Sequence, residues 1–134
     1  MKSGKITEDA KTAALAHIAP VSGFEGFADF DLVIESATEN EAIKRQIFEA
    51  VTPHLKPDCI IGSNTSSISI TRLAAVTGRP EKFMGIHFMN PVPVMELVEL
   101  IRGIATDETV FKTIQAFALT LGKTIAISED YPAF

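Results

Sequence analysis

The amino-acid sequence predicts an α/β fold, in which a mostly parallel sheet is flanked by helices. Short apolar runs alternate along the chain with segments whose apolar residues recur at helical spacing. The strongest apolar run, residues 32–34, is unbroken, which favours a strand buried on both faces of a parallel sheet. Polar clusters follow three of these runs, as expected where the carboxyl ends of strands form a ligand site.

The expected strands are short apolar segments with polar or turn-forming residues at their ends. Their alternation with helices suits crossover connections between parallel neighbours. We predict strands over residues 18–22, 30–35, 59–62, 83–88, 97–101 and 124–128.

The expected helices begin at residues that can cap an N-terminus and carry apolar side chains on one face. Thr7 caps an alanine-rich helix that Pro20 stops. Thr38 caps a second helix, whose apolar stripe runs from Ile43 to Leu55. Two further helices are predicted, over residues 69–77 and from Thr106 or Asp107 to Gly122.

The composition limits the classes of protein to which the chain can belong. With 134 residues, the chain is long enough for one domain and too short for two. The 12 basic and 17 acidic residues give a net charge of −5, which argues against a nucleic-acid partner, because phosphate binding needs clustered cations. No uncharged apolar stretch approaches the roughly 20 residues of a membrane span, so we expect no membrane partner.

The cysteine content and the N-terminus indicate the compartment. Cys59 has no second cysteine with which to form an internal disulfide, so a reducing compartment is expected. Residues 1–4 lead into a polar helix pattern and not into the apolar core of a secretory signal. We therefore predict a cytoplasmic protein, in which Cys59 is an inert residue of an apolar strand.

Polar residues gather after three consecutive predicted strands. Residues 36–40 (SATEN) follow the first of these strands and residues 63–66 (SNTS) follow the second. His87 and Asn90 come at the end of the third. Because the carboxyl ends of neighbouring parallel strands meet at one edge of a sheet, the pattern predicts one ligand crevice.

His87 is the natural acid/base candidate, because imidazole titrates near neutral pH. Glu99 lies twelve positions later, beyond a proline-rich break. If the chain reverses at that break, Glu99 returns beside His87 and favours the protonated imidazole. Glu96 competes for this role. The structural alternatives are a hydrogen-bonded histidine at a strand end and a solvated carboxylate on a strand face.

Three other polar residues carry both a functional and a structural interpretation. Ser66 can donate a hydrogen bond to a substrate oxygen, or it can cap a helix. Glu39 and Lys44 can contact a ligand, or they can lie on the exposed face of a helix. The sequence alone favours the structural interpretation of Ser66.

Several well-known motifs are absent from the sequence. None of the eight glycines forms a Gly-x-Gly pair, so there is no dinucleotide fingerprint. A nucleophile elbow and a phosphate-binding P-loop are missing as well. No group of His, Cys and Asp has the spacing of metal ligands, so we expect no metal.

Three segments carry a resemblance to a known family. Residues 63–67 (SNTSS) and 87–99 (HFMNPVPVMELVE) closely resemble the 3-hydroxyacyl-CoA dehydrogenases, and residues 31–40 (DLVIESATEN) are similar to a strand of the same family. That family includes 3-hydroxybutyryl-CoA dehydrogenases and the dehydrogenase part of multifunctional fatty-acid oxidation proteins. The resemblance covers nearly the whole chain in the right order, and its most specific part is the segment from His87 to Glu99.

The resemblance implies a Rossmann-like NAD-binding domain and an activity. The reaction is oxidation of an L-3-hydroxyacyl-CoA to the 3-ketoacyl-CoA, with hydride transfer to NAD. The residues that match the family's catalytic positions are His87, Glu99 and Ser66. The residues that match its cofactor contacts are Glu39, Lys44, Asn64 and Asn90.

The chain also departs from the family pattern. The family opens with a strand, a glycine-rich turn and a helix that hold the pyrophosphate, and it continues into a helical domain. We therefore predict that residues 1–134 are an incomplete NAD-binding domain that lacks the first βαβ unit, with Ala133 in place of a family glycine. Such a chain should bind NAD weakly or not at all. It should also self-associate through a bared strand edge.

Two other functions stay open at this point. The chain can be an idle fragment or interaction module that has inherited the site residues. It can also belong to an enzyme of the L-gulonate 3-dehydrogenase type, which uses similar motifs on a sugar acid.

Overall fold

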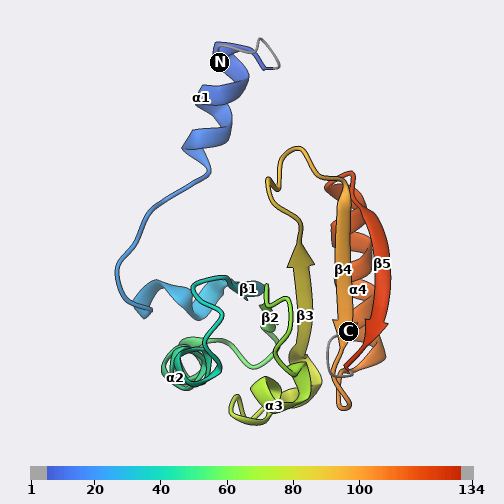
Figure 1. Ribbon diagram of the computed structural model, residues 1–134. Coiled ribbons are helices and arrows are strands. Elements are labelled where there is room, and N and C mark those ends of the chain that lie inside the picture. The colour runs from blue at the N-terminus through green and yellow to red at the C-terminus, as the bar shows by residue number, and fades with distance from the viewer. Residues whose placement is uncertain (1–5, 131–134) are drawn as a thin grey trace.

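The computed structural model describes residues 6–130, whose five strands form one sheet in the order β1-β2-β3-β4-β5 (Figure 1). β1, β2 and β3 are parallel neighbours, β4 returns antiparallel to β3, and β5 is parallel to β4. The predicted mostly parallel sheet is therefore confirmed. The strands are β1 (Leu32–Glu35), β2 (Ile60–Ser63), β3 (Phe83–Phe88), β4 (Leu97–Arg102) and β5 (Thr124–Glu129).

Helices cover both faces of the sheet. α2 (Glu41–Val51) and α3 (Ile70–Ala75) pack on one face and α4 (Glu108–Thr120) packs on the other. α1 (Glu8–Ala16) buries none of its residues and stands away from the sheet at the end of an extended connection (Figure 1). Short 3-10 helices cover Glu25–Asp29, Thr52–His54 and Pro80–Lys82.

The two cores follow from the alternation of side chains along the strands. Phe83 of β3 and Ile101 of β4 join the core beneath α2 and α3, where Phe48 is fully buried. Their chain neighbours Met84 and Leu100 point to the opposite face and pack against α4. The residues of each strand therefore divide between two sides, and this division also decides on which side the polar residues lie.

The helix boundaries show which of the candidate caps act. Asn40 and not Thr38 caps α2, since its side chain accepts a hydrogen bond from Ile43 N at 3.0 Å. Asp107, one of two candidates, caps α4. The predicted end of α4 is confirmed, because Gly122 has a φ of 76°, which suits a residue without Cβ.

Two predictions about the first strands need correction. Residues 18–22 are exposed and form no strand, because no neighbouring strand pairs with them in the described chain. The helix before them ends at Ala16, ahead of Pro20. Residues 32–34 do form β1, but they are only half-buried, since β1 is an edge of the described sheet and α4 lies over the strands farther along it.

A buried ion pair joins β1 to α2. The Lys44 ammonium lies 2.6 Å from Oε1 of Glu35, and the two side chains are 1% and 3% exposed. Glu35 also accepts hydrogen bonds from Ser63 Oγ and Ala37 N, both at 2.8 Å. The expectation that Lys44 lies on an exposed helix face is therefore wrong, because the ammonium neutralises a carboxylate inside the protein.

We expect Lys44→Met to lower the free energy of unfolding by about 3–5 kcal/mol, because it leaves the Glu35 carboxylate buried without its counter-charge. Urea denaturation of both proteins measures the loss. The double variant Glu35→Gln/Lys44→Met removes both charges and should recover most of the stability. A Lys44→Met protein as stable as the wild type would contradict this account of the pair.

No helix within residues 6–130 is long and apolar enough to cross a bilayer. The predictions about residues 1–4 and about Ala133 concern positions outside the described range.

Candidate functional site

The polar residues predicted to form a crevice lie at one edge of the sheet. β1, β2 and β3 run parallel, so Ser36, Asn64 and His87 lie at neighbouring strand ends. Hydrogen bonds connect these ends directly, as described below. The predicted gathering of polar residues at the carboxyl edge of these strands is confirmed, and that they form a ligand site stays a prediction.

His87 and Glu99 face each other across the antiparallel pair of β3 and β4. They are register partners, and Nδ1 of His87 lies 3.4 Å from Oε2 of Glu99. Their side chains are 19% and 28% exposed, so solvent reaches the pair. The distance is longer than a tight charge-assisted hydrogen bond. The predicted chain reversal that brings Glu99 beside His87 is confirmed.

Glu96 does not take part in this pair. It is exposed and precedes β4, where its backbone carbonyl accepts a hydrogen bond from Thr124 N. Because side chains alternate along a strand, the register of β4 selects Glu99 as the partner of His87.

Asn64 connects three strand ends. Its side-chain oxygen accepts a hydrogen bond from Phe88 N, and its side-chain nitrogen donates one to Ser36 Oγ, both at 2.8 Å. Its backbone N–H donates to the carbonyl of Glu35, also at 2.8 Å. Asn64 was predicted as a cofactor contact, and its amide is engaged within the protein.

Glu39 organises the loop that follows β2. Its Oε1 accepts hydrogen bonds from Thr65 Oγ1 at 2.5 Å, Ser66 N at 3.1 Å, Ser67 Oγ at 3.2 Å and Ser66 Oγ at 3.3 Å. Partial burial by itself raises the pKa of Glu39, but hydrogen bonds from Thr65, Ser66 and Ser67 outweigh it and hold the pKa below its ordinary value. The carboxylate is therefore ionised at neutral pH and fixes the loop.

The other predicted site residues differ in how far their side chains are exposed to solvent. Ser66 is exposed and does not cap α3, a role that Ser69 fills. Asn90 is exposed, two positions after β3. Lys44 is buried with Glu35 and presents no ammonium to the surface. Ser66 and Asn90 are thus accessible to a ligand at this edge, whereas Lys44 is not.

Two further residues shape the site: Ser36, which belongs to the predicted polar cluster but was given no role of its own, and Glu35, which sequence reasoning missed. Ser36 is the acceptor for the Asn64 amide, and Glu35 holds both Lys44 and Ser63. The available signal for Glu35 was a carboxylate placed directly after an unbroken apolar run. Such a residue must find a partner if its strand is buried.

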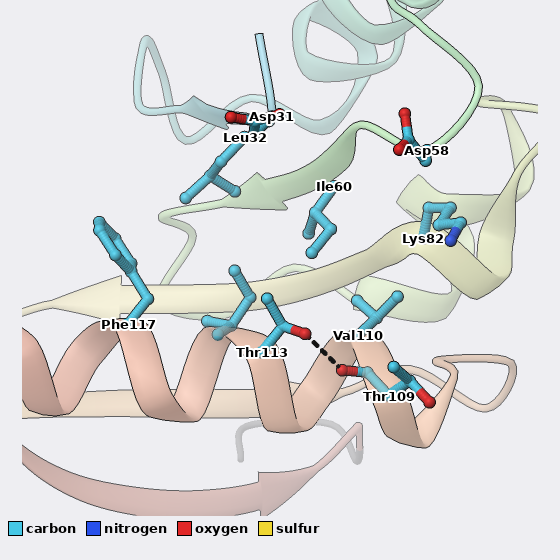
Figure 2. Close-up of a pocket in the computed structure, with 10 residues that line it drawn as sticks. Asp31, Leu32, Asp58, Ile60, Lys82, Thr109, Val110, Thr113 and Phe117 are labelled. Carbon is cyan, nitrogen blue, oxygen red and sulfur yellow. Dashed lines mark hydrogen bonds between the residues drawn. The ribbon is translucent and has the colours of Figure 1, made fainter.

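A groove lies on the opposite face of the sheet (Figure 2). It has a volume of about 660 Å³, and Leu32 of β1 and Ile60 of β2 project into it toward Val110 and Phe117 of α4. The His87–Glu99 pair lies elsewhere, since the neighbours of His87 on β3 are the residues that pack against α4. The groove is mainly apolar, and its lining includes no acid/base pair like that of His87 and Glu99.

Metal binding finds no support in the described chain. Residues 6–130 hold no group of three or more His, Cys, Asp or Glu side chains that can ligate an ion. Cys59 is fully buried, and this burial raises the pKa of its thiol, in agreement with the predicted inert residue.

Comparison with known proteins identifies the family. The family model described as 3-hydroxyacyl-CoA dehydrogenase, NAD binding domain, matches residues 1–131. The chain belongs to this family. Its cofactor is NAD, and its five-stranded, mostly parallel sheet is the Rossmann-like fold that the sequence predicts.

Individual relatives of the dehydrogenase family agree. The chain is 60% identical over 129 residues to the 3-hydroxybutyryl-CoA dehydrogenase of Bradyrhizobium diazoefficiens, covering 96% of this chain and 44% of that protein. It is 44% identical to the fatty acid oxidation complex subunit alpha of Psychrobacter cryohalolentis, covering 98% of this chain and 18% of that one. This chain thus spans less than half the length of these relatives.

The fold of the chain is also similar to that of a solved structure of a 3-hydroxybutyryl-CoA dehydrogenase. The crystal structure of (S)-3-hydroxybutyryl-CoA dehydrogenase from Ralstonia eutropha superposes with a TM-score of 0.96 at 46% identity. The match covers 99% of this chain and 47% of that one.

The lowered pKa of Glu39 predicts a pH-dependent contribution to stability. Because the pKa is lower in the folded than in the unfolded chain, the carboxylate stabilises the fold above about pH 4.5, and this stabilisation is lost as the pH falls through the lowered pKa. We expect Glu39→Gln to lower the free energy of unfolding by about 1 kcal/mol at pH 7, since solvent screens an exposed carboxylate.

Urea denaturation between pH 3 and 7 measures this effect, and the difference between the two proteins should shrink below about pH 4.5. Glu49→Gln, at an exposed position of α2, is the matched control and should show little difference at any pH. If both variants show the same change in the free energy of unfolding at every pH, Glu39 does not organise the loop.

Proposed function

We propose that this chain carries the acid/base pair of an NAD-dependent 3-hydroxyacyl-CoA dehydrogenase, which oxidises an L-3-hydroxyacyl-CoA to the 3-ketoacyl-CoA. The observation that carries the proposal is the pairing of His87 with Glu99 across β3 and β4. The names of relatives at 60% and 45% identity, both 3-hydroxybutyryl-CoA dehydrogenases, support an acyl-CoA substrate over a sugar acid.

In this proposal His87 is the general base. Its Nδ1 faces Glu99, so Nε2 is the nitrogen left to take the proton of the substrate hydroxyl. Glu99 accepts the Nδ1 hydrogen bond, fixes the ring and stabilises the imidazolium that results. The hydroxyl proton ends on His87, and the C3–O bond becomes a carbonyl.

Ser66 is the proposed donor to the substrate oxygen. Its backbone N–H donates to Glu39 Oε1 at 3.1 Å and holds the serine in place, whereas its hydroxyl, 3.3 Å from the same oxygen, turns away from Glu39 to donate to the substrate. Because the backbone of Ser66 is already held, only its hydroxyl has to reorient when the substrate arrives.

The NAD cofactor accepts the hydride from C3 when it is bound. Two of the predicted cofactor contacts have polar atoms available to bind NAD. Asn90 is exposed, and within residues 6–130 all the hydrogen bonds to Glu39 go to Oε1, which leaves Oε2 to accept from a ligand hydroxyl. Asn64 supports the site from behind in this arrangement, and Lys44 stays with Glu35.

A chimera tests the function in a full-length context. The matched segment of the Bradyrhizobium diazoefficiens enzyme is replaced by the 129 aligned residues of this chain, which is feasible at 60% identity. We expect the chimera to reduce acetoacetyl-CoA with NADH, and His87→Gln to lower its turnover by about 10²-fold or more, the usual scale of general acid–base catalysis.

Glu96→Gln is the matched control for Glu99→Gln in the same chimera, because only Glu99 faces His87. Glu99→Gln should lower turnover and Glu96→Gln should leave it nearly unchanged. A folded chimera without activity would favour the idle-module alternative, and unimpaired turnover of the His87→Gln chimera would refute the assignment of the base.

We also propose that copies of this chain associate through the outer edge of β1. β1 is one end of the described sheet, and its residues Leu32, Val33 and Ile34 are half-buried and apolar, which favours pairing with another strand. Equilibrium sedimentation at micromolar concentration should show a dimer or larger species. A monomeric wild type would contradict the proposal.

A further inference from the structure

The end of β3 is supported by a side chain and not by a strand on its β2 side. The backbone pairing of β2 with β3 stops at Ser63 and Gly85, whereas β3 continues to Phe88. His87 therefore lies on a stretch of β3 that β4 pairs on one side and that β2 no longer reaches on the other.

Asn64 occupies the place where β2 would have continued. In an antiparallel ladder, successive residues direct their N–H groups to opposite sides of the strand. His87 is the register partner of Glu99 on β4, and the N–H of the next residue, Phe88, points to the β2 side. The Asn64 side-chain oxygen accepts that N–H at 2.8 Å. Without it, a backbone donor next to His87 would lose its partner, at a cost comparable to a lost hydrogen bond.

The amide itself is held from the other side. Its nitrogen donates to Ser36 Oγ at the end of β1, and the Asn64 backbone N–H donates to the carbonyl of Glu35. The side chain is thus fixed at both of its polar atoms, and its oxygen cannot turn away from Phe88 without breaking the bond to Ser36. These hydrogen bonds therefore fix the end of β3 relative to the ends of β1 and β2.

We propose that Asn64 is the positioning residue that holds His87 opposite Glu99. The inference rests on the proposed function for its catalytic meaning, but the arrangement that it claims exists in the chain without substrate or cofactor. The Asn64 side chain is hydrogen-bonded to the backbone of Phe88, so it acts on His87 through the backbone of β3. This assignment differs from the cofactor contact that the family resemblance implies for the same residue.

The test is nuclear magnetic resonance of the 134-residue chain. The hydrogen-bonded Nδ1 proton of His87 should give a ring signal that Glu99→Gln abolishes. We expect Asn64→Ala to abolish the same ring signal and to speed amide exchange at Phe88 by about fivefold or more, the factor for the loss of one ordinary hydrogen bond. Asn64→Thr, which suits a strand end but is too short to bridge, should act in the same way if the alanine variant does not fold.

Two further variants distinguish a specific loss of His87 positioning from a general loosening of the fold. Ser36→Ala removes one side of the anchor and keeps the acceptor for Phe88, so most of the ring signal should remain. Asn64→Asp keeps an acceptor for Phe88 N–H, and the Ser36 hydroxyl can turn and donate to it, so the signal should be rescued.

Three results would overturn the inference. They are a wild-type chain without the ring signal, a folded Asn64→Ala or Asn64→Thr protein in which the signal and the Phe88 exchange are unchanged, and an equal loss in Ser36→Ala. The proposed function fails on a different result, an active His87→Gln chimera, so the two failures are distinguishable.

Discussion

The antiparallel return of β4 along β3 is the constraint on which the site depends. Every other pairing in the sheet is parallel and needs a crossover, which places partner residues far apart in the sequence. Only the reversal after β3 lets two residues twelve positions apart face each other in register. A shift of that register by one residue would move Glu99 to the opposite face of the sheet and replace it with an apolar side chain.

Where the strands end, polar side chains form the hydrogen bonds that the backbone of a neighbouring strand would otherwise form. Asn64 replaces a residue of β2 beside Phe88, and Glu39 takes up the donors of the loop after β2. Glu35 does the same between β1 and α2, where it is neutralised by Lys44. Each group satisfies donors that would otherwise be left unpaired near a buried edge. Under the proposed function, the same bonds also fix the edge at which the ligand binds.

The two faces of the sheet have different roles. The face of α2 and α3 carries the charged and hydrogen-bonded groups at its edge, and the face of α4 carries the large apolar groove beside β1 and β2. The decisive feature is the direction in which strand residues point, which alternates from His87 to Phe88.

The sequence by itself determined the fold class, the order of the strands and helices after residue 30, and the candidates His87 and Glu99. These follow from local patterns, namely apolar runs, helical spacing, capping residues and a proline-rich reversal. The tertiary structure alone decided that Lys44 is buried, that Asn64 is bonded on both sides and that residues 18–22 form no strand. The physical reason is that burial and pairing depend on neighbours distant in sequence, so a lysine at a helical position looks exposed until Glu35 of β1 is placed beside it.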